Sequence, residues 1–190
     1  MNEKKLMIVG VGGQGTLLAS KLLGRLLLTR GVDVKVSEVH GMSQRGGSVV
    51  TYVCFGDKVY SPIVDKGEAD VIVSFELLEA ARYLPYLKKG GTIVTNTQET
   101  LPMPVITGAM AYPEELVKKL QDSGANVVAL DALSLAEEAG TSRAVNLVLM
   151  GKLSSLFDFT EEEWMNAIEQ SMPARFIDMN KKAFLLGKQA

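Results

Sequence analysis

Several features that mark whole classes of protein are scarce in this chain of 190 residues. Basic and acidic residues nearly balance, at 20 and 22, so the formal net charge of -2 carries no signature of a nucleic-acid-binding protein. The single cysteine, Cys54, allows neither an internal disulfide nor an iron–sulfur cluster held by this chain. Because Cys54 lies in the apolar stretch 49–55, we expect it to be a small buried side chain.

Long hydrophobic runs are also missing. No stretch approaches the roughly 18 consecutive apolar residues of a membrane-spanning helix. Lys4 and Lys5 followed by residues 6–9 resemble the start of a signal peptide, but glycines in residues 10–15 interrupt the apolar run too early. With so little cysteine, we expect a soluble cytoplasmic protein without a membrane partner. A chain of this length should form one domain that buries roughly 70% of its unfolded surface.

The most informative pattern that is present is a glycine turn near the start of the chain. An apolar strand at residues 6–9 leads into Gly10, Gly12 and Gly15, which match G-x-G-x-x-G, and a helical pattern follows at residues 17–28. Strand, glycine turn and helix begin a dinucleotide-type βαβ unit, in which the free N–H groups of the first helical turn favour an anion. The motif alone is weak, and a purely structural turn is the alternative.

The rest of the chain alternates between strand and helix patterns. A turn at residues 56–58 predicts a hairpin between two strands, and Gly90 and Gly91 predict a helix end. We therefore expect an α/β fold: a Rossmann-like three-layer sandwich with a mostly parallel sheet, one antiparallel hairpin and C-terminal helices. The expected strands are 32–39, 48–55, 59–64, 69–74, 92–95 and 126–130, and the expected helices are 76–87, 113–123, 132–139, 143–157 and 175–188.

One further helix start is signalled by a local motif. Thr160 and Glu163 form the T-x-x-E pattern of a capping box, in which each residue bonds to the other's backbone. Phe159 and Trp164 stand at the positions of the hydrophobic staple. Asn146 and Asn180, in two later helices, are expected to bond to backbone groups rather than to a ligand.

Residues 40–47 form a segment too rich in glycine and polar groups for the interior of a helix or strand. We expect a surface loop beside the carboxyl ends of the first strands, where open α/β sheets bind ligands. The guanidinium of Arg45 suits a phosphate, a substrate carboxylate or an acidic group of a partner, with a surface ion pair as the alternative. Met42 offers an exposed thioether that suits a subunit interface.

Three other residues near the turn and loop have two interpretations each. Glu38 lies 23 positions after Gly15, where a dinucleotide fold places its ribose-binding acid, but we favour an ion pair with Arg45 that holds the loop. The Gln14 amide suits a polar ligand or a facing loop, and solvent exposure is its alternative. His40, the single histidine, is expected to be a hydrogen-bonded structural residue more than a general base.

Three segments resemble the gamma-type subunits of 2-oxoacid:ferredoxin oxidoreductases. They are Gly-Val-Gly-Gly-Gln-Gly at 10–15, Ser-Glu-Val-His-Gly-Met-Ser-Gln-Arg-Gly-Gly-Ser at 37–48 and Asn-Leu-Val-Leu-Met-Gly at 146–151. The middle segment is the most specific, because no fold requires its residues in that order. The resemblance covers essentially all of residues 1–190, which implies one gamma-type domain, and within the family it is strongest to the indolepyruvate branch.

The resemblance implies a subunit of a complex that oxidatively decarboxylates a 2-oxoacid to an acyl-CoA and passes electrons to ferredoxin. It places thiamine diphosphate and the iron–sulfur clusters on a large alpha subunit, so no cofactor is expected in this chain alone, and a contact to coenzyme A is left open. We expect no catalytic residue and no metal ligand. The expected partner-facing or cofactor-binding residues are Gly10, Gly12, Gly13, Gln14, Gly15, Glu38, His40, Met42, Ser43, Gln44, Arg45, Gly46 and Gly47.

Our leading hypothesis is an accessory subunit that is inactive alone, because no nucleophile with its base and no acid–base pair emerges from the sequence. Its exposed docking face would allow the isolated chain to form a homodimer. One alternative is a stand-alone NAD- or FAD-binding Rossmann-type oxidoreductase that uses the glycine turn and Glu38. A nucleotide-sensing or scaffolding module is the other.

Overall fold

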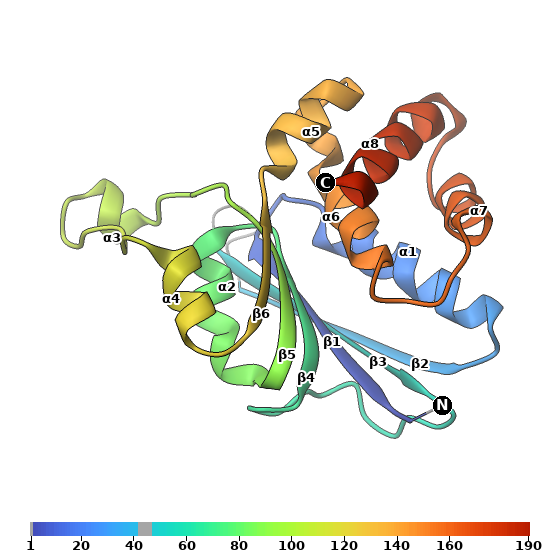
Figure 1. Ribbon diagram of the computed structural model, residues 1–190, viewed down its shortest axis with the longest axis horizontal. Helices are drawn as coiled ribbons and strands as arrows, with labels where there is room; N and C mark the ends of the chain where they lie inside the picture. The colour runs from blue at the N-terminus through green and yellow to red at the C-terminus, as the bar shows by residue number, and fades with distance from the viewer. Residues whose placement is uncertain (1, 42–46) are drawn as a thin grey trace.

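A computed structural model describes residues 2–41 and 47–190. Its centre is a six-stranded sheet of order β2-β3-β1-β4-β5-β6 with helices on both faces (Figure 1). This arrangement confirms the expected α/β sandwich. The strands are β1 (Lys4–Val11), β2 (Asp33–His40), β3 (Ser48–Gly56), β4 (Ala69–Ser74), β5 (Leu87–Asn96) and β6 (Asn126–Leu130).

The strand directions bring several chain segments to one edge of the sheet. Parallel pairing joins β1 to β4, β4 to β5 and β5 to β6, whereas β3 runs antiparallel to both β1 and β2. The register pairs Val11 with Ser48 and His40 with Val49. The ends of β1 and β2 and the start of β3 therefore lie together on the side of the sheet where β4, β5 and β6 also end. We call this side, formed by strand ends and not by an outer strand, the carboxyl edge. The opposite edge is the amino edge.

Successive residues of β1 point into two separate cores. Leu6 and Ile8 pack with helices of one face, while Met7 and Val9 pack with those of the other. The first face carries α1 (Thr16–Thr29), α5 (Ala132–Ala139), α6 (Val145–Ser154), α7 (Glu161–Ser171) and α8 (Ile177–Gln189), and the second carries α2 (Leu77–Tyr83) and α4 (Leu116–Asp122) (Figure 1). The remaining helical elements are α3 (Met103–Ile106), η1 (Leu84–Tyr86), η2 (Ser142–Ala144) and η3 (Ala174–Phe176).

The predicted capping box is present at the start of α7. Thr160 Oγ1 accepts from Glu163 N at 3.2 Å, and Glu163 Oε2 accepts from Thr160 N at 2.7 Å. The staple rings of Phe159 and Trp164 are 6.2 Å apart. Arg30, at the end of α1, donates from Nε to Glu163 Oε1 at 2.7 Å, and this bond lowers the pKa of Glu163 to about 2. The end of α1 is thus tied to the start of α7.

The predicted hairpin at residues 56–58 is wrong. Residues 59–64 are irregular, and the antiparallel partners of β3 are β1 and β2. Pro62 has no N–H to donate to a strand ladder, and its carbonyl oxygen instead accepts from Cys54 Sγ at 3.3 Å. Val59 and Val64 are buried in the core of the α2 face, as is Cys54. The apolar residues of this segment therefore pack over the sheet without joining it.

Two predicted helix boundaries are also wrong. The helix expected at 76–87 ends as α2 at Tyr83, because Pro85 cannot continue it. Gly90 and Gly91 lie within β5 and do not end a helix. The helix expected to open at Pro113 begins at Leu116 instead. In the parts of the chain that the structure describes, no helix has the length and apolar character needed to cross a lipid bilayer.

Candidate functional site

The glycine turn connects β1 to α1 at the carboxyl edge. Gly13 and Gly15 have φ angles of 99° and 89°, a region that favours glycine. Gly10 is required for a different reason, since a Cβ there would lie 2.7 Å from Gln14 Oε1 and 3.0 Å from Phe75 Cβ. No side chain caps the start of α1, so the first N–H groups of this helix face the space above the turn.

Gln14 folds back over the turn. Its Oε1 accepts from Val11 N at 2.7 Å, and its Nε2 lies 3.5 Å from the carbonyl oxygen of Phe75, just after β4. Asn96, at the end of β5, donates from Nδ2 to the same Phe75 oxygen at 3.3 Å. Of the interpretations of Gln14, contact with a facing segment fits these bonds and solvent exposure does not. The amide links the glycine turn to the ends of the neighbouring strands.

A hollow of about 360 Å³ lies between the turn, the end of β2 and the start of β3. Its volume is at the lower end of the range for small-ligand sites, roughly 300–1,000 Å³. Gly12 N donates to Gly47 O at 2.9 Å, so the turn directly contacts the point where the polar loop rejoins the fold. The hollow is lined by Gly12, Gly13, Gly15, Thr16, Leu17, Glu38, His40 and Val49.

Glu38 and His40 face each other beside this hollow. His40 Nδ1 is 3.5 Å from Glu38 Oε1, and Thr51 Oγ1 donates to Glu38 Oε2 at 3.3 Å. The hydrogen-bonded structural role expected of His40 stays a prediction. The predicted ion pair between Glu38 and Arg45 lies outside the described residues, as do the predictions for Met42, Ser43, Gln44 and Gly46.

Sequence reasoning missed a set of buried polar residues at this edge. Asn96 is fully buried, and its Oδ1 accepts from Ala132 N at 3.1 Å while its Nδ2 bonds to Phe75. Glu76 and Glu79 are buried as well. Asn96 ends β5, and Glu76 follows β4 by two positions. A polar residue at the end of an apolar strand was therefore the signal that could have found them.

The two asparagines expected to bond to backbone groups do so. Asn146 is buried in α6, and its Oδ1 accepts from Leu147 N at 3.0 Å. A Cβ on Gly15 would lie 3.0 Å from Asn146 Nδ2, so α6 closely approaches the glycine turn. Asn180 Nδ2 donates to the carbonyl oxygen of Phe176 at 2.8 Å.

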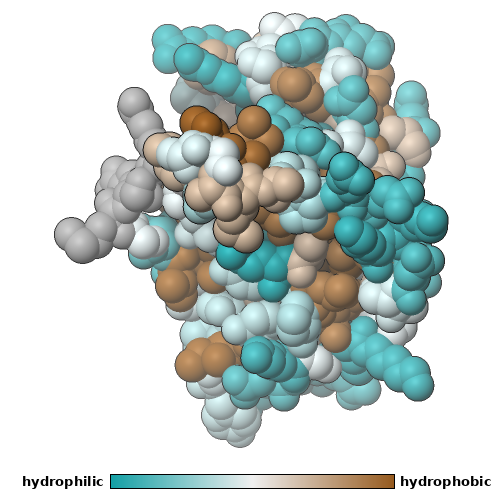
Figure 2. All heavy atoms as spheres, turned by 90° about the vertical axis from the view of Figure 1, so that its left-hand side faces the viewer, coloured by the Kyte–Doolittle hydropathy of each residue, from teal (hydrophilic) through white to brown (hydrophobic). Residues whose placement is uncertain are grey.

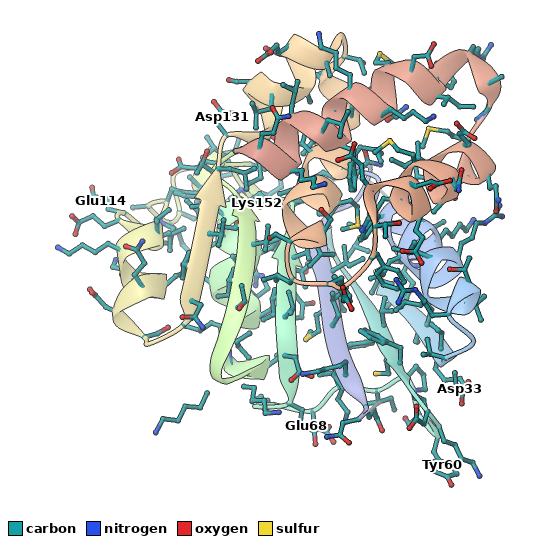
Figure 3. All side chains as sticks on the ribbon, turned by 45° about the vertical axis from the view of Figure 1, so that its right-hand side comes forward. Asp33, Tyr60, Glu68, Glu114, Asp131 and Lys152 are labelled. Atoms are coloured by element: carbon teal, nitrogen blue, oxygen red, sulfur yellow. The ribbon has the colours of Figure 1, made fainter. Side chains whose placement is uncertain are left out.

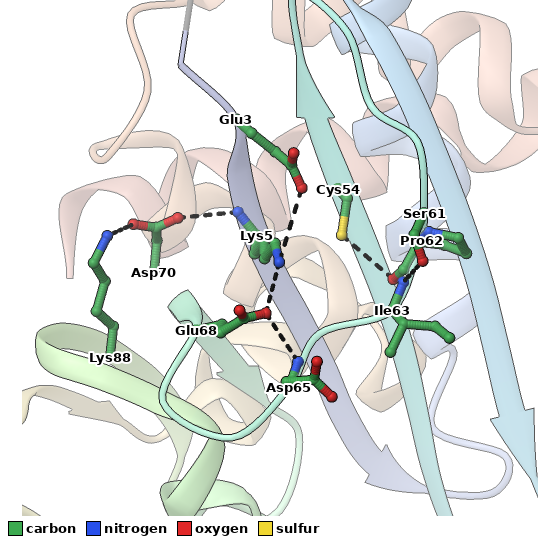
Figure 4. Close-up of polar contacts among 10 residues, drawn as sticks. All are labelled: Glu3, Lys5, Cys54, Ser61, Pro62, Ile63, Asp65, Glu68, Asp70 and Lys88. Carbon is green, nitrogen blue, oxygen red and sulfur yellow. Dashed lines mark hydrogen bonds and ion pairs between the residues drawn. The ribbon is translucent and has the colours of Figure 1, made fainter.

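A larger cavity, of about 480 Å³, lies at the amino edge and contains none of the predicted site residues. Three of the charged residues that line it are paired: Lys4 with Asp70 at 3.7 Å, and Arg30 with Glu163. Lys5 lines it as well, and its Nζ contacts Glu68 Oε2 at 2.6 Å, which raises the pKa of Lys5 and lowers that of Glu68 (Figure 4). Glu68 marks this edge in Figure 3, and Asp131 marks the carboxyl edge.

We place the candidate site at the carboxyl edge, where the predicted site residues that the structure describes lie together. Within residues 2–41 and 47–190, no group of three or more His, Cys, Asp or Glu side chains is arranged to hold a metal ion.

Comparison with known proteins identifies the family. The family model described as pyruvate ferredoxin/flavodoxin oxidoreductase matches residues 5–190. The chain belongs to this family. It is 48% identical to the indolepyruvate oxidoreductase subunit IorB of Thermococcus kodakarensis, over 100% of this chain and 96% of that protein. It is 37% identical to the subunit of the same name from Archaeoglobus fulgidus, over 96% and 92%. The resemblance stated from the sequence is confirmed.

Solved structures show the same fold both as a separate chain and within a longer one. The pyruvate oxidoreductase subunit PORC of Thermotoga maritima aligns with a TM-score of 0.77 and 21% identity, over 100% of this chain and 97% of that one. A 2-oxoglutarate:ferredoxin oxidoreductase from Magnetococcus marinus aligns with a TM-score of 0.78 and 18% identity over all of this chain, which spans only 31% of that chain.

Proposed function

We propose that this chain is an accessory subunit of an indolepyruvate ferredoxin oxidoreductase. The complex would oxidatively decarboxylate an aryl pyruvate to the acyl-CoA and pass the electrons to ferredoxin. The observation that carries this proposal is the 48% identity to an indolepyruvate oxidoreductase subunit over nearly the full length of both chains.

The cofactors of this reaction belong, in our proposal, to a large alpha subunit that binds thiamine diphosphate and iron–sulfur clusters. The single cysteine of this chain supports that division, because a cluster needs several thiolates. Cys54 is also fully buried, and burial raises the pKa of its thiol to about 11. We place the complex in the cytoplasm, since a chain with one cysteine cannot form the internal disulfides that are typical of proteins in an oxidising compartment.

The carboxyl edge is the part of this chain that we assign to the shared site. The uncapped start of α1 and the hollow beside it suit an anionic group, such as a phosphate of coenzyme A, or an acidic side chain of the partner. The bond between Gly12 and Gly47 joins the turn and the polar loop into one rim. This rim positions the bound group or the partner, and the groups that break bonds are on the partner.

The test is reconstitution with the large subunit from the same source. The co-expressed pair should purify together and reduce ferredoxin in the presence of indolepyruvate and coenzyme A, while this chain alone should show no turnover. Robust turnover of a 2-oxoacid by the pure chain with ferredoxin would contradict the proposal. So would micromolar binding of NAD(H) or FAD in equilibrium dialysis, which would favour a stand-alone enzyme.

Helix α1 provides a matched pair of variants for the rim. Leu17 lines the hollow and Leu28 lies at the other end of the helix, and both side chains are exposed. Leu17→Asp should lower the activity of the complex at least tenfold, because it places a negative charge where we expect an anion. Leu28→Asp should leave it within twofold. A carboxylate is favourable near a helix N-terminus and unfavourable near its C-terminus, so helix stability would bias the result in the opposite direction.

A further inference from the structure

A segment that connects β5 to α4 projects from the body of the molecule. We call residues 97–115, which include α3, the α3 arm; Figure 1 shows it extending past α4. Four large apolar side chains of the arm are exposed, at 48%, 66%, 61% and 65% for Leu101, Met103, Ile106 and Met110. Figure 2 views the molecule from this side and shows apolar residues in brown among hydrophilic residues in teal. Clustered apolar exposure of this kind marks an interaction surface.

The root of the arm is held by one buried carboxylate. Glu76 is only 1% exposed, and its Oε1 accepts from Thr100 N at 3.0 Å and from the Tyr112 hydroxyl at 2.8 Å. Its Oε2 accepts from Glu79 N at 2.9 Å. Both ends of the arm therefore bond to the same side chain. Burial and the neighbouring carboxylate raise the pKa of Tyr112, so its hydroxyl remains a donor at neutral pH.

The tip of the arm is ordered by its own backbone. Met110 N donates to Pro104 O at 3.0 Å and Gly108 N donates to Val105 O at 3.0 Å, which closes the chain after α3 into a compact turn. A segment fixed at its root and closed at its tip loses little conformational freedom when it binds. The apolar side chains are thus presented outside the fold in a preorganised arrangement.

We propose that the α3 arm is the docking element for the large subunit of the oxidoreductase, and that its tip enters an apolar groove with a basic rim. This inference rests on the proposed function and names the surface that holds the partner. The arm carries Glu99, Glu114 and Glu115, and no lysine or arginine occurs between Lys89 and Lys118. Its charge is repelled by an anionic lipid surface and by the same arm of a second copy, and it complements a basic rim.

The related proteins support a larger polypeptide as the occupant. This chain spans 31% of the Magnetococcus protein, and 36% of the ketoisovalerate oxidoreductase subunit VorA of Methanothermobacter marburgensis, to which it is 28% identical. In those proteins the domain is joined covalently to the rest of the polypeptide. This chain covers 96% of the Thermococcus kodakarensis subunit, so that protein has no such further length of polypeptide. A domain of that kind needs a noncovalent element in place of the covalent link, and we assign this role to the arm.

The experiment measures binding of the purified chain to the purified large subunit by titration calorimetry. The double variant Met103→Ser with Ile106→Ser should lose more than tenfold in affinity, since exposed apolar anchors dominate binding energy. Ile63→Ser is the matched control, because Ile63 is 60% exposed and lies three residues after Tyr60 in the 57–68 segment. Figure 3 shows Tyr60 far from Glu114 at the end of the arm. The control should stay within twofold, and both variants should keep the native melting temperature.

The outcomes separate this inference from the proposed function. If the native chain does not bind the large subunit, the proposed function falls, and this assignment with it. If the native chain binds and the double variant binds equally well, the proposed function stands and the assignment of the arm is overturned. If light scattering shows a native dimer that the double variant converts to a monomer, without a change in binding to the large subunit, the arm is covered by a second copy and the inference is wrong.

Discussion

The contact between α6 and α8 should be the part of the fold most sensitive to a single added methyl group. A Cβ on Gly151 would lie 1.9 Å from Phe184 O, and a Cβ on Gly187 would lie 2.0 Å from Val148 O. Both obstructing atoms belong to helix backbone and cannot rotate away. Since ordinary contact begins at 3.4 Å, the helices would have to separate by about 1.5 Å, the difference between 3.4 and 1.9 Å.

The cost of this separation follows from the packing around it. Leu147 and Phe184 are fully buried in the same core, so moving α8 away weakens their contacts. A gap of about 0.5–1 Å already forfeits roughly a quarter to a half of the dispersion attraction. Overpacking typically costs about 1–3 kcal/mol. Because two backbones collide, we expect about 3 kcal/mol for either Gly→Ala change, a large share of a typical stability of about 5–15 kcal/mol.

Urea unfolding followed by circular dichroism would measure these costs. Gly24 in α1 is the matched control, because the nearest atom to a Cβ there is Val36 Cγ2 at 3.9 Å. Gly24→Ala should raise the free energy of unfolding by about 0.5–1 kcal/mol, since alanine is the better helix former. If Gly151→Ala and Gly187→Ala changed it by less than about 0.5 kcal/mol, the helices would be adjusting freely and the reasoning would be refuted.

Two further predictions concern single polar groups. The pKa of Glu163 is lowered to about 2 by its bond to Arg30, so its charge stabilises the fold above its ordinary pKa of 4.5 and ceases to do so as the pH falls through about 2. Glu163→Gln should therefore lower the melting temperature at pH 7 but not near pH 2; an equal deficit at both values would contradict this. Tyr112→Phe removes a donor from the buried Glu76 carboxylate and should cost about 1.5–3 kcal/mol. Limited proteolysis should then cut the α3 arm faster, and unchanged cleavage would show that the bond does not hold the arm.

Much of the fold could be predicted because its signals are local. The bounds of β6 and α5 agree with the expected 126–130 and 132–139. Asp131 caps the start of α5, where its side chain accepts from Ser134 N, and Gly140 ends the helix with a φ of 120°. Each of these signals acts within one helical turn of the boundary that it sets. No knowledge of distant contacts is needed to interpret them.

The wrongly predicted hairpin shows that local signals do not decide which strands pair. Residues 59–64 have an apolar pattern that fits a strand, but a strand can pair with β3 only along a free edge of β3. Both hydrogen-bonding sides of β3 are already paired, one with β1 and the other with β2. Strand β1 lies far away in the sequence, so the conflict is invisible to a local pattern. Val59 and Val64 produce the apolar pattern because they are buried on the face of the sheet, not because they belong to a strand.

The candidate site likewise has one part that local signals predict and one part that depends on contacts distant in the sequence. The glycine turn could be predicted because positive φ angles and close approach act on the glycines themselves. The role of Glu76 could not, because its donors on Thr100 and Tyr112 are 24 and 36 positions away. Only the order of the strands brings them to the end of β4. The α3 arm was therefore absent from the sequence interpretation, although its exposed apolar residues are visible in the sequence.

The two surfaces that we assign to the partner arise from one edge of the sheet. The hollow lies where β1 and β2 end, and the α3 arm leaves the end of β5. Gln14 and Asn96 both contact the carbonyl oxygen of Phe75, so a chain of bonds joins the turn at the end of β1 to the base of the arm. At the amino edge, the backbone N of Lys5 already bonds to Asp70 and its Nζ to Glu68. A single partner surface laid across the carboxyl edge would contact both the rim and the arm.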